Sequence, residues 1–312
     1  MSVFTDFQQK LSASIQDIQL RFDEPMSKHT SFRIGGPAEV MAFPKNTQEL
    51  SALMCAAAEL KIQPAILGAG TNVLAPDAGL PGLCICLKDA LDGMELLEGN
   101  RIRVMAGVTM TRAAVFAANH SLSGMEFAHG IPGTVGGGVY MNAGAYGGEI
   151  CQILTDSTCY DGEDRTVKTL AASEHHFAYR HSSYREHPER IVLSASFALQ
   201  PGDRAAIRAM MDDLMGRRMS KQPLECPSAG SAFKRCEGRF TAQMIDEAGL
   251  KGFAIGGAQV SEKHAGFIIN RGGATSADVR ALIAHIQCEL KKRFDVDICP
   301  EIVYIPPTGR EG

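Results

Sequence analysis

The sequence predicts an α+β protein of about two or three domains, and three observations support that class. The chain has 312 residues, enough to bury several separate cores. Helical apolar spacing and strand-like alternation follow each other in mixed order along the chain, as in an α+β fold. Pro201-Gly202 marks a boundary between two such blocks, so we expect a break near residue 200.

Two helices are predicted in the first block. Residues 46–61 have Asn46 as an N-cap and Glu49 at the third helical position, and Pro64 stops the helix. Residues 109–119 are the second helix candidate. The apolar face of the first helix consists of Leu50, Leu53, Met54 and Ala57. Strands are predicted at 65–67, which we expect to be short and buried, and at 153–160 and 191–199.

The second block contains three predicted helices and a closing strand. Residues 203–221 end in basic side chains, as helix C-termini prefer. Its inward face is predicted to be Ile207, Met210, Met211, Leu214 and Met215. Residues 241–248 form a short helix stopped by Gly249, and residues 302–305 form the strand. The third helix, 276–293, has an inward face of Val279, Leu282, Ile283, Ile286 and Leu290.

Composition excludes several classes of protein. The formal net charge of −4 points to neither nucleic acid nor an anionic membrane surface. Residues 1–10 lack the pattern of a secretory signal, and no run of about 18 apolar residues exists. The nine cysteines are scattered and contain no CxxC pair with metal spacing. We therefore expect reduced thiols, a cytoplasmic location and no metal site.

Two segments are rich in glycine. LGAGTNVL (67–74) follows a strand, so its backbone N–H groups suit a pyrophosphate, although a tight structural turn is an equal alternative. It is not a Rossmann fingerprint, because Val73 stands where a third glycine is required. GIPGTVGGGVYMNAGAYGGE (130–149) lets backbone approach a large planar ligand, or else forms bulges in a sheet. Two such segments in one domain favour a dinucleotide cofactor.

Three further motifs carry reactive or charged side chains. Arg180, next to Tyr179, suits bidentate binding of a carboxylate or phosphate, although a solvated surface charge is the simpler interpretation. Ser231 lies in PSAGSAFKR (227–235), which is not a GxSxG elbow, so a Ser-His-Asp hydrolase is disfavoured. Glu301 precedes the apolar closing strand, a position that is usually a surface one.

In this order the five motifs resemble those of the UDP-N-acetylenolpyruvoylglucosamine reductases, and the resemblance covers residues 30–305. The shorter variant of the family is the closer match, because no long insertion lies between Ser183 and Ile191. Thr71 and Cys236 differ from the serine and proline common there, and neither change removes a reacting group. The matching segments are LGAGTNVL, GIPGTVGGGVYMNAGAYGGE, YRHSSYR, KQPLECPSAGSAFKR, SEKHAGFIIN and PEIVYI.

The resemblance implies a fold, two cofactors and a reaction. It implies an FAD-binding region of the vanillyl-alcohol-oxidase (PCMH) type with two subdomains, residues 21–200 with a break near 90–100, and a C-terminal α+β substrate domain, residues 201–307. Residues 1–20 would be a leader and 308–312 a tail. Non-covalent FAD and NADPH would reduce the enolpyruvyl group of a UDP-sugar to give UDP-N-acetylmuramate for peptidoglycan. We expect a monomer without nucleic-acid or membrane partners.

The same resemblance assigns roles to individual residues. Arg180, Ser231 and Glu301 match the three catalytic positions, with Ser231 as the proton donor. The substrate-binding assignments are Tyr179, Lys221, Arg235 and His264. The cofactor-binding assignments are Gly68, Gly70, Thr71, Asn72, Gly130, Ile131, Pro132, Gly133, Thr134, Gly136, Gly137, Asn142 and Gly144.

Two alternative functions remain open at this point. A sugar-alcohol oxidase would tether its flavin through a His or Cys in the glycine segments, and His129 is the one candidate near the second segment. A catalytically dead homologue that senses a UDP-sugar would lose Arg180, Ser231 or Glu301, yet all three are present.

Overall fold

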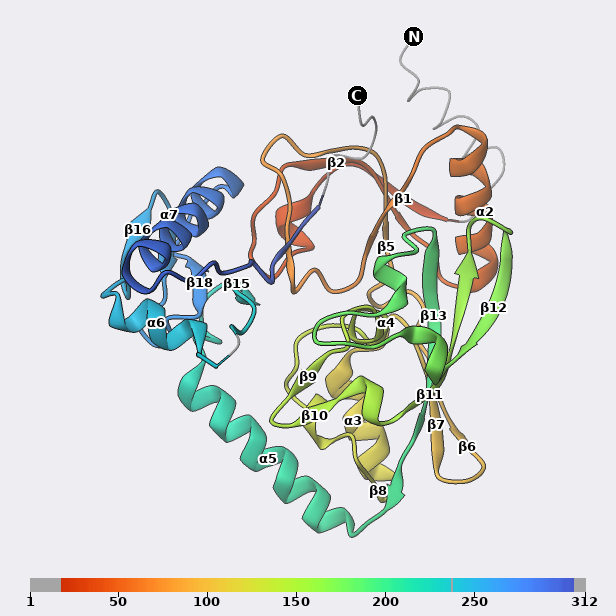
Figure 1. The fold of residues 1–312 in the computed structure, drawn as a ribbon. Helices are drawn as coiled ribbons and strands as arrows, with labels where there is room; N and C mark the ends of the chain where they lie inside the picture. Colours follow the sequence, from red (N-terminus) through yellow and green to blue (C-terminus); the bar gives the residue numbers. More distant parts are fainter. Residues whose placement is uncertain (1–17, 237, 306–312) are drawn as a thin grey trace. The chain divides into compact units, whose positions relative to one another are not determined.

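The computed structural model describes residues 18–236 and 238–305 of the chain. The chain divides into two compact units, each described here by itself (Figure 1). Unit 1 consists of Met1–Arg21, Met41–Ala69 and Leu83–Arg217, and unit 2 of Phe22–Val40, Gly70–Gly82 and Arg218–Gly312. The α+β class is confirmed. Most of the predicted leader and all of the predicted tail lie outside the described residues, and the predicted domain ranges stay predictions.

Unit 1 is built on a five-stranded antiparallel sheet with the order β12-β11-β13-β7-β6. The predicted strands at 153–160 and 191–199 are confirmed as β11 (Leu154–Asp161) and β13 (Arg190–Ala198). Helix α4 packs against β7 and β13, and α3 packs against α4 (Figure 1). The remaining elements of this layer are β6 (Met94–Leu97), β7 (Arg101–Met105), β12 (Thr166–Ala171), α3 (Met110–Asn119) and α4 (Val135–Tyr140).

The predicted helix at 46–61 is observed as α2 (Thr47–Glu59), with Asn46 as its N-cap. The Asn46 side chain accepts a hydrogen bond from Glu49 N at 2.9 Å, a cap that contributes about 1 kcal/mol. The predicted inward face is right except for Met54, which is only half-buried, whereas Ala56 is buried. Ala56 takes that place because it follows Leu53 by three positions and so lies over the core.

A four-stranded sheet has the order β1-β2-β5-β3, in which β3 pairs with β5 in parallel. The predicted strand at 65–67 is confirmed, but the expectation that it is buried is wrong, since Ile66 is 37% exposed. The reason is that β3 is an edge strand, whose alternate side chains point away from the core. The four strands are β1 (Gln19–Pro25), β2 (Pro37–Phe43), β3 (Ala65–Leu67) and β5 (Leu80–Cys86).

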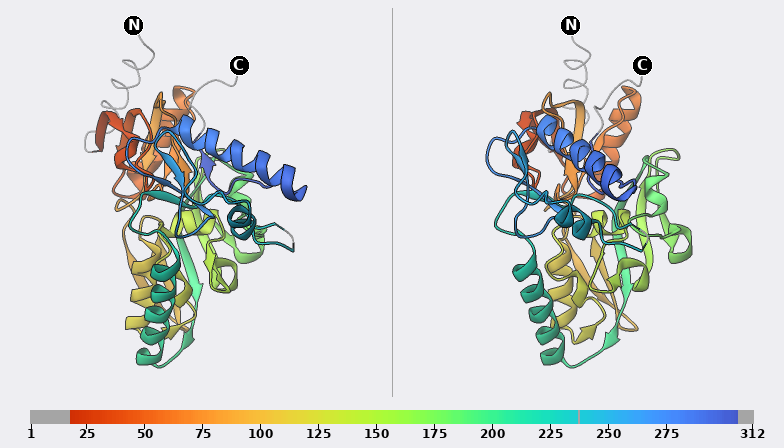
Figure 2. Two further views of the ribbon diagram at one scale, coloured as in Figure 1. Left: turned by 90° about the vertical axis from the view of Figure 1, so that its left-hand side faces the viewer. Right: turned by 60° about the vertical axis from the view of Figure 1, so that its left-hand side comes forward.

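Unit 2 contains a small antiparallel sheet with the order β15-β18-β17-β16. Helix α7 (Ser276–Phe294) packs on β16 and β17, and α6 (Thr241–Glu247) packs on α7 (Figure 2). All five residues predicted to face inward from α7 are buried in the core of this unit. The strands are β15 (Ser228–Ser231), β16 (Ala254–Ile255), β17 (Ala258–Val260) and β18 (Phe267–Asn270).

The first turn of α7 is capped twice. Thr275 and Asp278 form a capping box, as expected for this sequence pattern. The carboxylate of Asp77 also accepts from Ser276 N at 2.7 Å and from Ala277 N at 3.0 Å. Asp77 follows β4 (Val73–Leu74), which pairs in parallel with β19 (Val303–Tyr304). The predicted closing strand at 302–305 is thus confirmed over its two central residues.

Helix α5 (Arg204–Lys221) confirms the predicted helix at 203–221. Asp203 caps it, because its side chain accepts from Ala206 N at 2.8 Å. The predicted inward face is wrong at Met210, which is 54% exposed, and at Met215, which is only half-buried. Ile207, Met211 and Leu214 are spaced four and three residues apart and form a narrow buried stripe, so Met210 lies beside it.

The glycine-rich residues 124–148 contain a helix that the sequence does not predict, α4. None of the described helices is long and apolar enough to cross a bilayer. The remaining short elements are η1 (Met26–Lys28), β8 (Leu122–Ser123), η2 (Glu126–Ala128), β9 (Gly144–Ala145), β10 (Gly148–Glu149), η3 (Ile150–Gln152), η4 (Ala172–His175), η5 (Ser183–Arg185) and β14 (Gln200–Pro201).

Candidate active site

The second glycine segment in unit 1 is held against the end of β7 by backbone hydrogen bonds. Gly136 N donates to Ala106 O at 3.0 Å, and Val135 N donates to Val108 O at 2.8 Å. Thr134 caps α4, since its hydroxyl accepts from Gly137 N at 3.4 Å. Segment 134–137 is therefore held in one conformation by its backbone, as a binding loop requires.

The glycines of this segment differ in what surrounds them. A Cβ on Gly136 would lie 2.9 Å from the Cβ of Ala106, so that glycine permits close packing within the protein. A Cβ on Gly137 would meet Thr134 Oγ1 alone, at 3.6 Å, which is ordinary contact. The side of Gly137 is thus open, and backbone there is accessible to a ligand.

The two glycine motifs meet within unit 1. A Cβ on Gly68 would lie 2.6 Å from the hydroxyl of Thr134, so no larger residue fits at Gly68 without a shift. Gly68 follows β3, and its carbonyl accepts a long hydrogen bond from Cys86 Sγ at 3.9 Å. The structure therefore brings one predicted cofactor residue from each motif together, as binding of one cofactor requires.

Arg180 lies in a loop of unit 1 that is tied to the same glycine segment. Its guanidinium donates to the carbonyls of Asn142 at 3.5 Å and Gly144 at 3.2 Å. The guanidinium also lies over the ring of Tyr179, 5.1 Å from its centroid, and that ring is 40% exposed. Arg180 has a left-handed φ of +54°, a strained conformation for a non-glycine residue that concentrates at functional sites.

Asn142 is buried, and its side chain is fully engaged within unit 1. Nδ2 donates to Glu149 Oε2 and to Ala178 O, each at 3.1 Å, and Oδ1 accepts from Cys151 N at 3.0 Å. The assignment of Asn142 to the cofactor stays a prediction. What the structure adds is that this side chain holds the loop that carries Arg180.

In unit 2 the remaining part of the first glycine motif lies beside β19. Gly70 has a left-handed φ of +63°, and a Cβ there would collide with His29 O, so only glycine fits. Asn72 O accepts from Val303 N at 2.9 Å, and Asn72 Nδ2 donates to Glu301 O at 3.3 Å. Asn72 therefore contacts the backbone of a predicted catalytic residue.

Ser231 and Glu301 occupy adjacent segments of unit 2. Ser231 is the last residue of β15, is half-buried, and its hydroxyl donates to Phe233 O at 3.2 Å. The next residue, Ala232, accepts from Glu301 N at 2.9 Å and donates to Gly266 O at 2.8 Å. The structure thus brings together two of the three predicted catalytic residues.

Ser31 is a residue of this region that the sequence analysis missed. Its hydroxyl donates to Ser228 O at 2.6 Å, and its backbone N–H donates to Gly70 O at 3.0 Å. Ser31 thereby links the glycine turn to β15, the strand that ends in Ser231. Ser31 precedes the apolar residues Phe32 and Ile34, and nothing in this local sequence predicts its hydrogen bond with Ser228.

Lys221 and His264, two of the predicted substrate-binding residues, lie within electrostatic range of each other in unit 2. Burial lowers the pKa of His264, and the positive charges of Lys251 and Lys221 lower it further, against its own backbone hydrogen bond, which raises it. Nδ1 of His264 accepts from Gly266 N at 3.1 Å, which requires that nitrogen to be unprotonated. Lys221 and Arg235 are exposed. Lys221 and His264 together present donors suited to phosphate oxygens.

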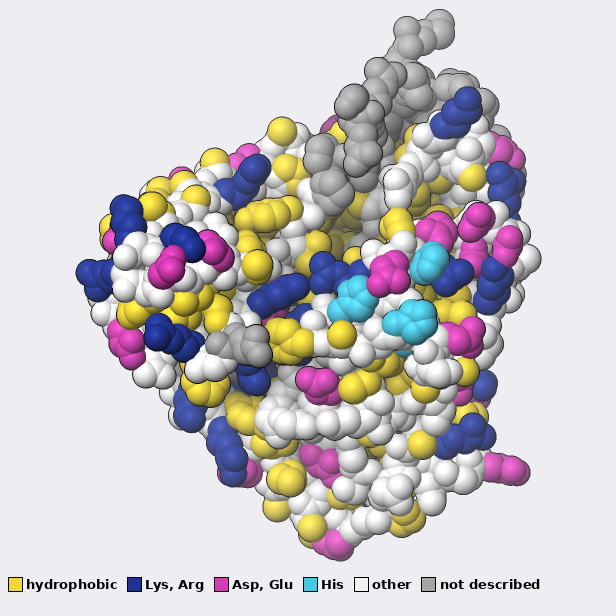
Figure 3. Space-filling view, in the orientation of Figure 1, with side chains coloured by type: hydrophobic (Ala, Val, Ile, Leu, Met, Phe, Trp, Pro, Cys, Tyr) yellow, Lys and Arg dark blue, Asp and Glu magenta, His cyan; other side chains and the backbone are white. Residues whose placement is uncertain are grey.

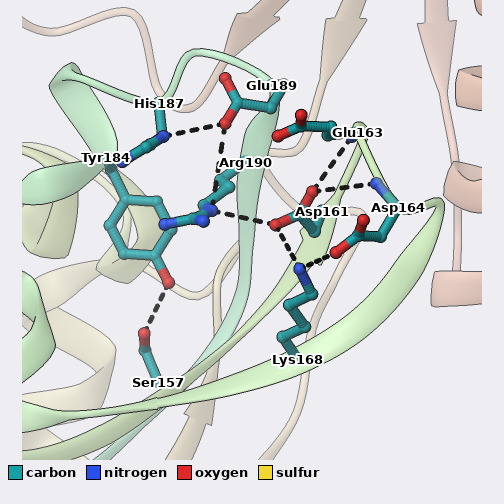
Figure 4. A network of polar contacts seen from close by, with 9 residues as sticks. All are labelled: Ser157, Asp161, Glu163, Asp164, Lys168, Tyr184, His187, Glu189 and Arg190. Carbon is teal, nitrogen blue, oxygen red and sulfur yellow. Dashed lines mark hydrogen bonds and ion pairs between the residues drawn. The ribbon is translucent and has the colours of Figure 1, made fainter.

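A separate polar cluster closes the β11–β12 hairpin of unit 1 (Figure 4). The buried carboxylate of Asp161 accepts from Lys168 Nζ and Arg190 Nε, each at 3.0 Å, and from backbone N–H groups. Burial alone would raise the pKa of Asp161, but these hydrogen bonds lower it to about 2. Figure 3 shows histidine and acidic side chains gathered on one part of this face. In Figure 4, His187 Nδ1 lies next to Glu189 Oε1, at 3.0 Å. No predicted site residue belongs to this cluster.

The predicted site residues are thus distributed over both units, and each group is coherent within its own unit. No group of three or more potential metal ligands occurs in the described part of the chain. Unit 1 holds Gly68, Gly130, Ile131, Pro132, Gly133, Thr134, Gly136, Gly137, Asn142, Gly144, Tyr179 and Arg180. Unit 2 holds Gly70, Thr71, Asn72, Lys221, Ser231, Arg235, His264 and Glu301.

Comparison with known proteins identifies two domains and close relatives. Residues 38–169 match the model of an FAD binding domain, and residues 222–305 match that of the UDP-N-acetylenolpyruvoylglucosamine reductase C-terminal domain. UDP-N-acetylenolpyruvoylglucosamine reductase of Lactobacillus acidophilus is 46% identical over 97% of this chain and 99% of its own. The enzyme of that name from Latilactobacillus sakei is 45% identical over 92% of this chain and 93% of its own.

A solved structure agrees with these matches. The crystal structure of UDP-N-acetylenolpyruvylglucosamine reductase from Thermus caldophilus superposes with a TM-score of 0.78 at 29% identity, over 93% of this chain and 99% of that one. The predicted fold, an FAD-binding region followed by a C-terminal α+β domain, is confirmed. The chain is an FAD-dependent oxidoreductase that belongs to the UDP-N-acetylenolpyruvoylglucosamine reductase family.

Proposed function

We propose that this protein uses NADPH to reduce the enolpyruvyl group of UDP-N-acetylglucosamine enolpyruvate, giving UDP-N-acetylmuramate. The single observation that carries the proposal is the backbone contact between Glu301 and Ala232, which fixes Glu301 next to Ser231. We propose further that the reaction serves peptidoglycan precursor synthesis, cell shape and cell division, and that the protein acts in the cytoplasm as a monomer.

The glycine segments of unit 1 fit FAD. Gly137 presents open backbone, and Gly68 approaches Thr134 too closely for any larger residue. Backbone N–H groups of this kind suit phosphate and flavin oxygens without a covalent bond. Bound there, FAD would supply the redox chemistry of the reaction, namely transfer of a hydride from NADPH to the enolpyruvyl double bond. We assign the glycines and Thr134 of unit 1 to holding it. The assignments of Gly70, Thr71 and Asn72 to the cofactor stay predictions from the sequence motif.

Arg180 is assigned to the negative charge that develops next to the substrate carboxylate. Two of its guanidinium N–H groups contact the carbonyls of Asn142 and Gly144, which fixes the plane of the group before substrate arrives. A charge fixed in advance stabilises a developing anion without reorganisation, the largest single contribution in many enzymes. Tyr179, beside it, is assigned to substrate binding.

Ser231 is assigned as the proton donor to the substrate carbon, with Glu301 supporting it. A serine hydroxyl is a weak acid, so it needs neighbours that favour its alkoxide. The segment that follows Ser231 carries Lys234 and Arg235, whose charges act in that direction. Glu301, whose backbone N–H binds the carbonyl of the next residue, Ala232, is assigned to relay the proton or to face the developing charge.

Lys221, Arg235 and His264 are assigned to the diphosphate and sugar of the substrate. Lys221 ends α5. Burial lowers the pKa of His264, and the positive charge of Lys221 contributes to the same direction. Neutral His264 keeps a ring nitrogen on Gly266 N and leaves the other to donate. Such a mixture of charged and neutral donors suits a nucleoside diphosphate.

The absorption spectrum of the purified protein tests this proposal. Under nitrogen, NADPH should bleach the visible flavin band, and the enolpyruvyl UDP-sugar should restore it while gaining two hydrogen atoms. A protein that bleaches but does not recover with this substrate would contradict the assigned reaction. Colour that stays with acid-precipitated protein would instead favour the oxidase with a flavin tethered at His129.

A further inference from the structure

Asn142 makes an unusually complete set of contacts for one side chain. It is 1% exposed and has a left-handed φ of +44°, which asparagine tolerates better than most residues. Both N–H bonds of its amide are used, on Glu149 Oε2 and Ala178 O, and its oxygen accepts from Cys151 N. The side chain thus satisfies two acceptors and one donor at once.

These contacts converge on the loop of Arg180. Ala178 lies two residues before Arg180, and its N–H and carbonyl exchange hydrogen bonds with His181 at 3.2 and 3.1 Å. The backbone carbonyl of Asn142 in turn accepts from the Arg180 guanidinium at 3.5 Å. Asn142 therefore contacts both the base of this turn and the charged group at its tip, through different atoms.

We propose that Asn142 is a positioning residue that sets the direction of the Arg180 guanidinium. The inference rests on the proposed function for the role of Arg180, but its structural part stands on the contacts alone. Ser182, whose hydroxyl donates to Tyr140 O at 2.8 Å, and Arg185, which donates to Arg180 O at 2.9 Å, also hold the loop. Asn142 differs from both because it also supplies an acceptor for the guanidinium.

Asparagine is the residue type that these contacts require. Aspartate has the same shape and keeps the acceptor for Cys151 N, but it has no N–H for Ala178 O and repels Glu149. Glycine keeps the left-handed backbone and the carbonyl, but loses all three side-chain bonds. The two substitutions therefore remove the side-chain hydrogen bonds of Asn142 in different ways. Both leave its left-handed backbone conformation accessible.

The experiment is a double-mutant cycle on the holoenzyme at pH 8, with Asn142→Asp, Arg180→Ala and their combination. Both amide hydrogens and the amide oxygen of Asn142 are engaged by protein atoms, so Asn142→Asp should retain FAD and bleach with NADPH within about twofold of wild type. Loss of FAD would overturn the inference in favour of the predicted cofactor-binding role of Asn142. Recovery with the enolpyruvyl UDP-sugar should slow by about 10- to 100-fold, the effect of a misplaced catalytic group. In the Arg180→Ala background the same change should cost less than about twofold, because Asn142 acts through Arg180. Asn142→Gly makes the same comparison if the aspartate variant does not fold.

A structural readout separates this inference from the reaction itself. Hydrogen exchange at the amides of Ala178 and His181 should quicken by about tenfold or more in Asn142→Asp, since their turn loses its anchor. Asp161→Asn is the matched control, because it disturbs a buried polar cluster of unit 1 without contact to this loop. It should leave both flavin half-reactions within about twofold of wild type.

Three further results would overturn the inference. The first is that Asn142→Asp leaves hydrogen exchange at the amides of Ala178 and His181 unchanged. The second is that Asn142→Asp slows recovery as much in the Arg180→Ala background as in wild type. The third is that Asn142→Asp slows bleaching as much as it slows recovery. If wild-type protein itself does not recover with the UDP-sugar, the proposed function fails, and the exchange measurement alone decides whether Asn142 anchors the loop.

Discussion

The backbone N–H of Glu301 donates to the carbonyl of Ala232 at 2.9 Å, which fixes Glu301 beside the residue that follows Ser231. Asn72 reinforces this contact, because its amide donates to Glu301 O at 3.3 Å. Three motifs that lie far apart in the sequence thus meet in unit 2 through backbone atoms. Backbone contacts of this kind hold segments in place while the side chains remain available for chemistry.

Replacement of Ser231 by alanine should separate the two halves of the reaction. Reduction of FAD by NADPH needs no proton for the sugar, so bleaching should be normal. Recovery of the flavin band with the enolpyruvyl substrate should slow by about 10²- to 10⁴-fold, the range for a positioned proton donor. Stopped-flow absorbance under nitrogen measures both steps.

Two companion variants sharpen that test. Ser231→Cys should recover part of the rate, because a thiol is a stronger acid than an alcohol. Glu301→Gln should slow recovery and leave bleaching intact, since its backbone contact with Ala232 is preserved. If Ser231→Ala slows bleaching as much as recovery, Ser231 belongs to the cofactor site or to the structure, and the donor is another group.

Gly137→Val should yield a folded protein that purifies without flavin. A Cβ at Gly137 meets only ordinary contact with Thr134, so the valine projects into the open side where we place FAD. Gly136→Val is the contrasting variant, because a Cβ there would lie 2.9 Å from the Cβ of Ala106, so this variant should lose stability, which Gly137→Val should keep. Flavin content per protein and thermal unfolding distinguish the two variants. Full flavin in Gly137→Val would refute the placement of the cofactor.

Substitutions of Arg180 and Lys221 should change different kinetic parameters, kcat for Arg180 and KM for Lys221. Arg180→Lys keeps the charge but loses the planar fork that contacts the carbonyls of Asn142 and Gly144, so kcat should fall more than KM rises. Lys221→Ala removes an exposed charge from the end of α5 and should raise KM for the UDP-sugar with little change in kcat. Steady-state kinetics with the substrate varied checks both, and the reverse pattern would exchange their roles.

The local elements were predictable from the sequence because their signals are local. Asn46, the N-cap predicted for the first helix, caps α2 in the structure. Thr109 and Thr275 cap α3 and α7 in the same way, although neither was named as a cap from the sequence. The predicted strands of unit 1 were found within two residues of their expected ends, as alternation allows. Helix α4 was not predicted, because Gly137 and its neighbours have low helix propensity and only packing against β7 and β13 makes the segment helical.

The candidate site was predictable as a set of residues but not as an arrangement. The resemblance of the motifs assigned Arg180, Ser231 and Glu301, but nothing in their spacing indicates that Ala232 binds the backbone of Glu301. The role of Asn142 depends on Ala178, 36 residues away, a separation without sequence periodicity. Contacts between loops follow from tertiary packing, which single-residue patterns do not record.

A buried chain of hydrogen bonds in unit 1 leads to the last prediction. His175 Nδ1 lies 2.9 Å from Ala171 O, which only accepts, so Nδ1 carries the proton. Nε2 therefore accepts from the Ser157 hydroxyl at 2.7 Å. Ser157 in turn accepts from the Tyr184 hydroxyl at 2.6 Å, the contact drawn in Figure 4. Every polar atom of this chain has a hydrogen-bond partner only while His175 is neutral. Burial lowers the pKa of His175, whereas its backbone hydrogen bonds, among them the one to Ala171, and the charges of nearby carboxylates raise it, and burial is the largest cause.

The sign of the pH effect follows from that shift. With the pKa lower in the folded state than the unfolded value of about 6.5, the unfolded chain binds a proton first as the pH falls. The free energy of unfolding should therefore be greatest above pH ~6.5 and decline below it, by at most about 1.4 kcal/mol per pH unit from this group.

His175→Gln should be less stable at pH 7.5 and show a shallower decline, because glutamine does not titrate. Urea denaturation at intervals from pH 7.5 to pH 5 measures both slopes, and equal slopes would mean that His175 does not contribute to acid sensitivity. Since His264 also has a lowered pKa, the difference between variant and wild type, rather than the wild-type slope, isolates the buried chain.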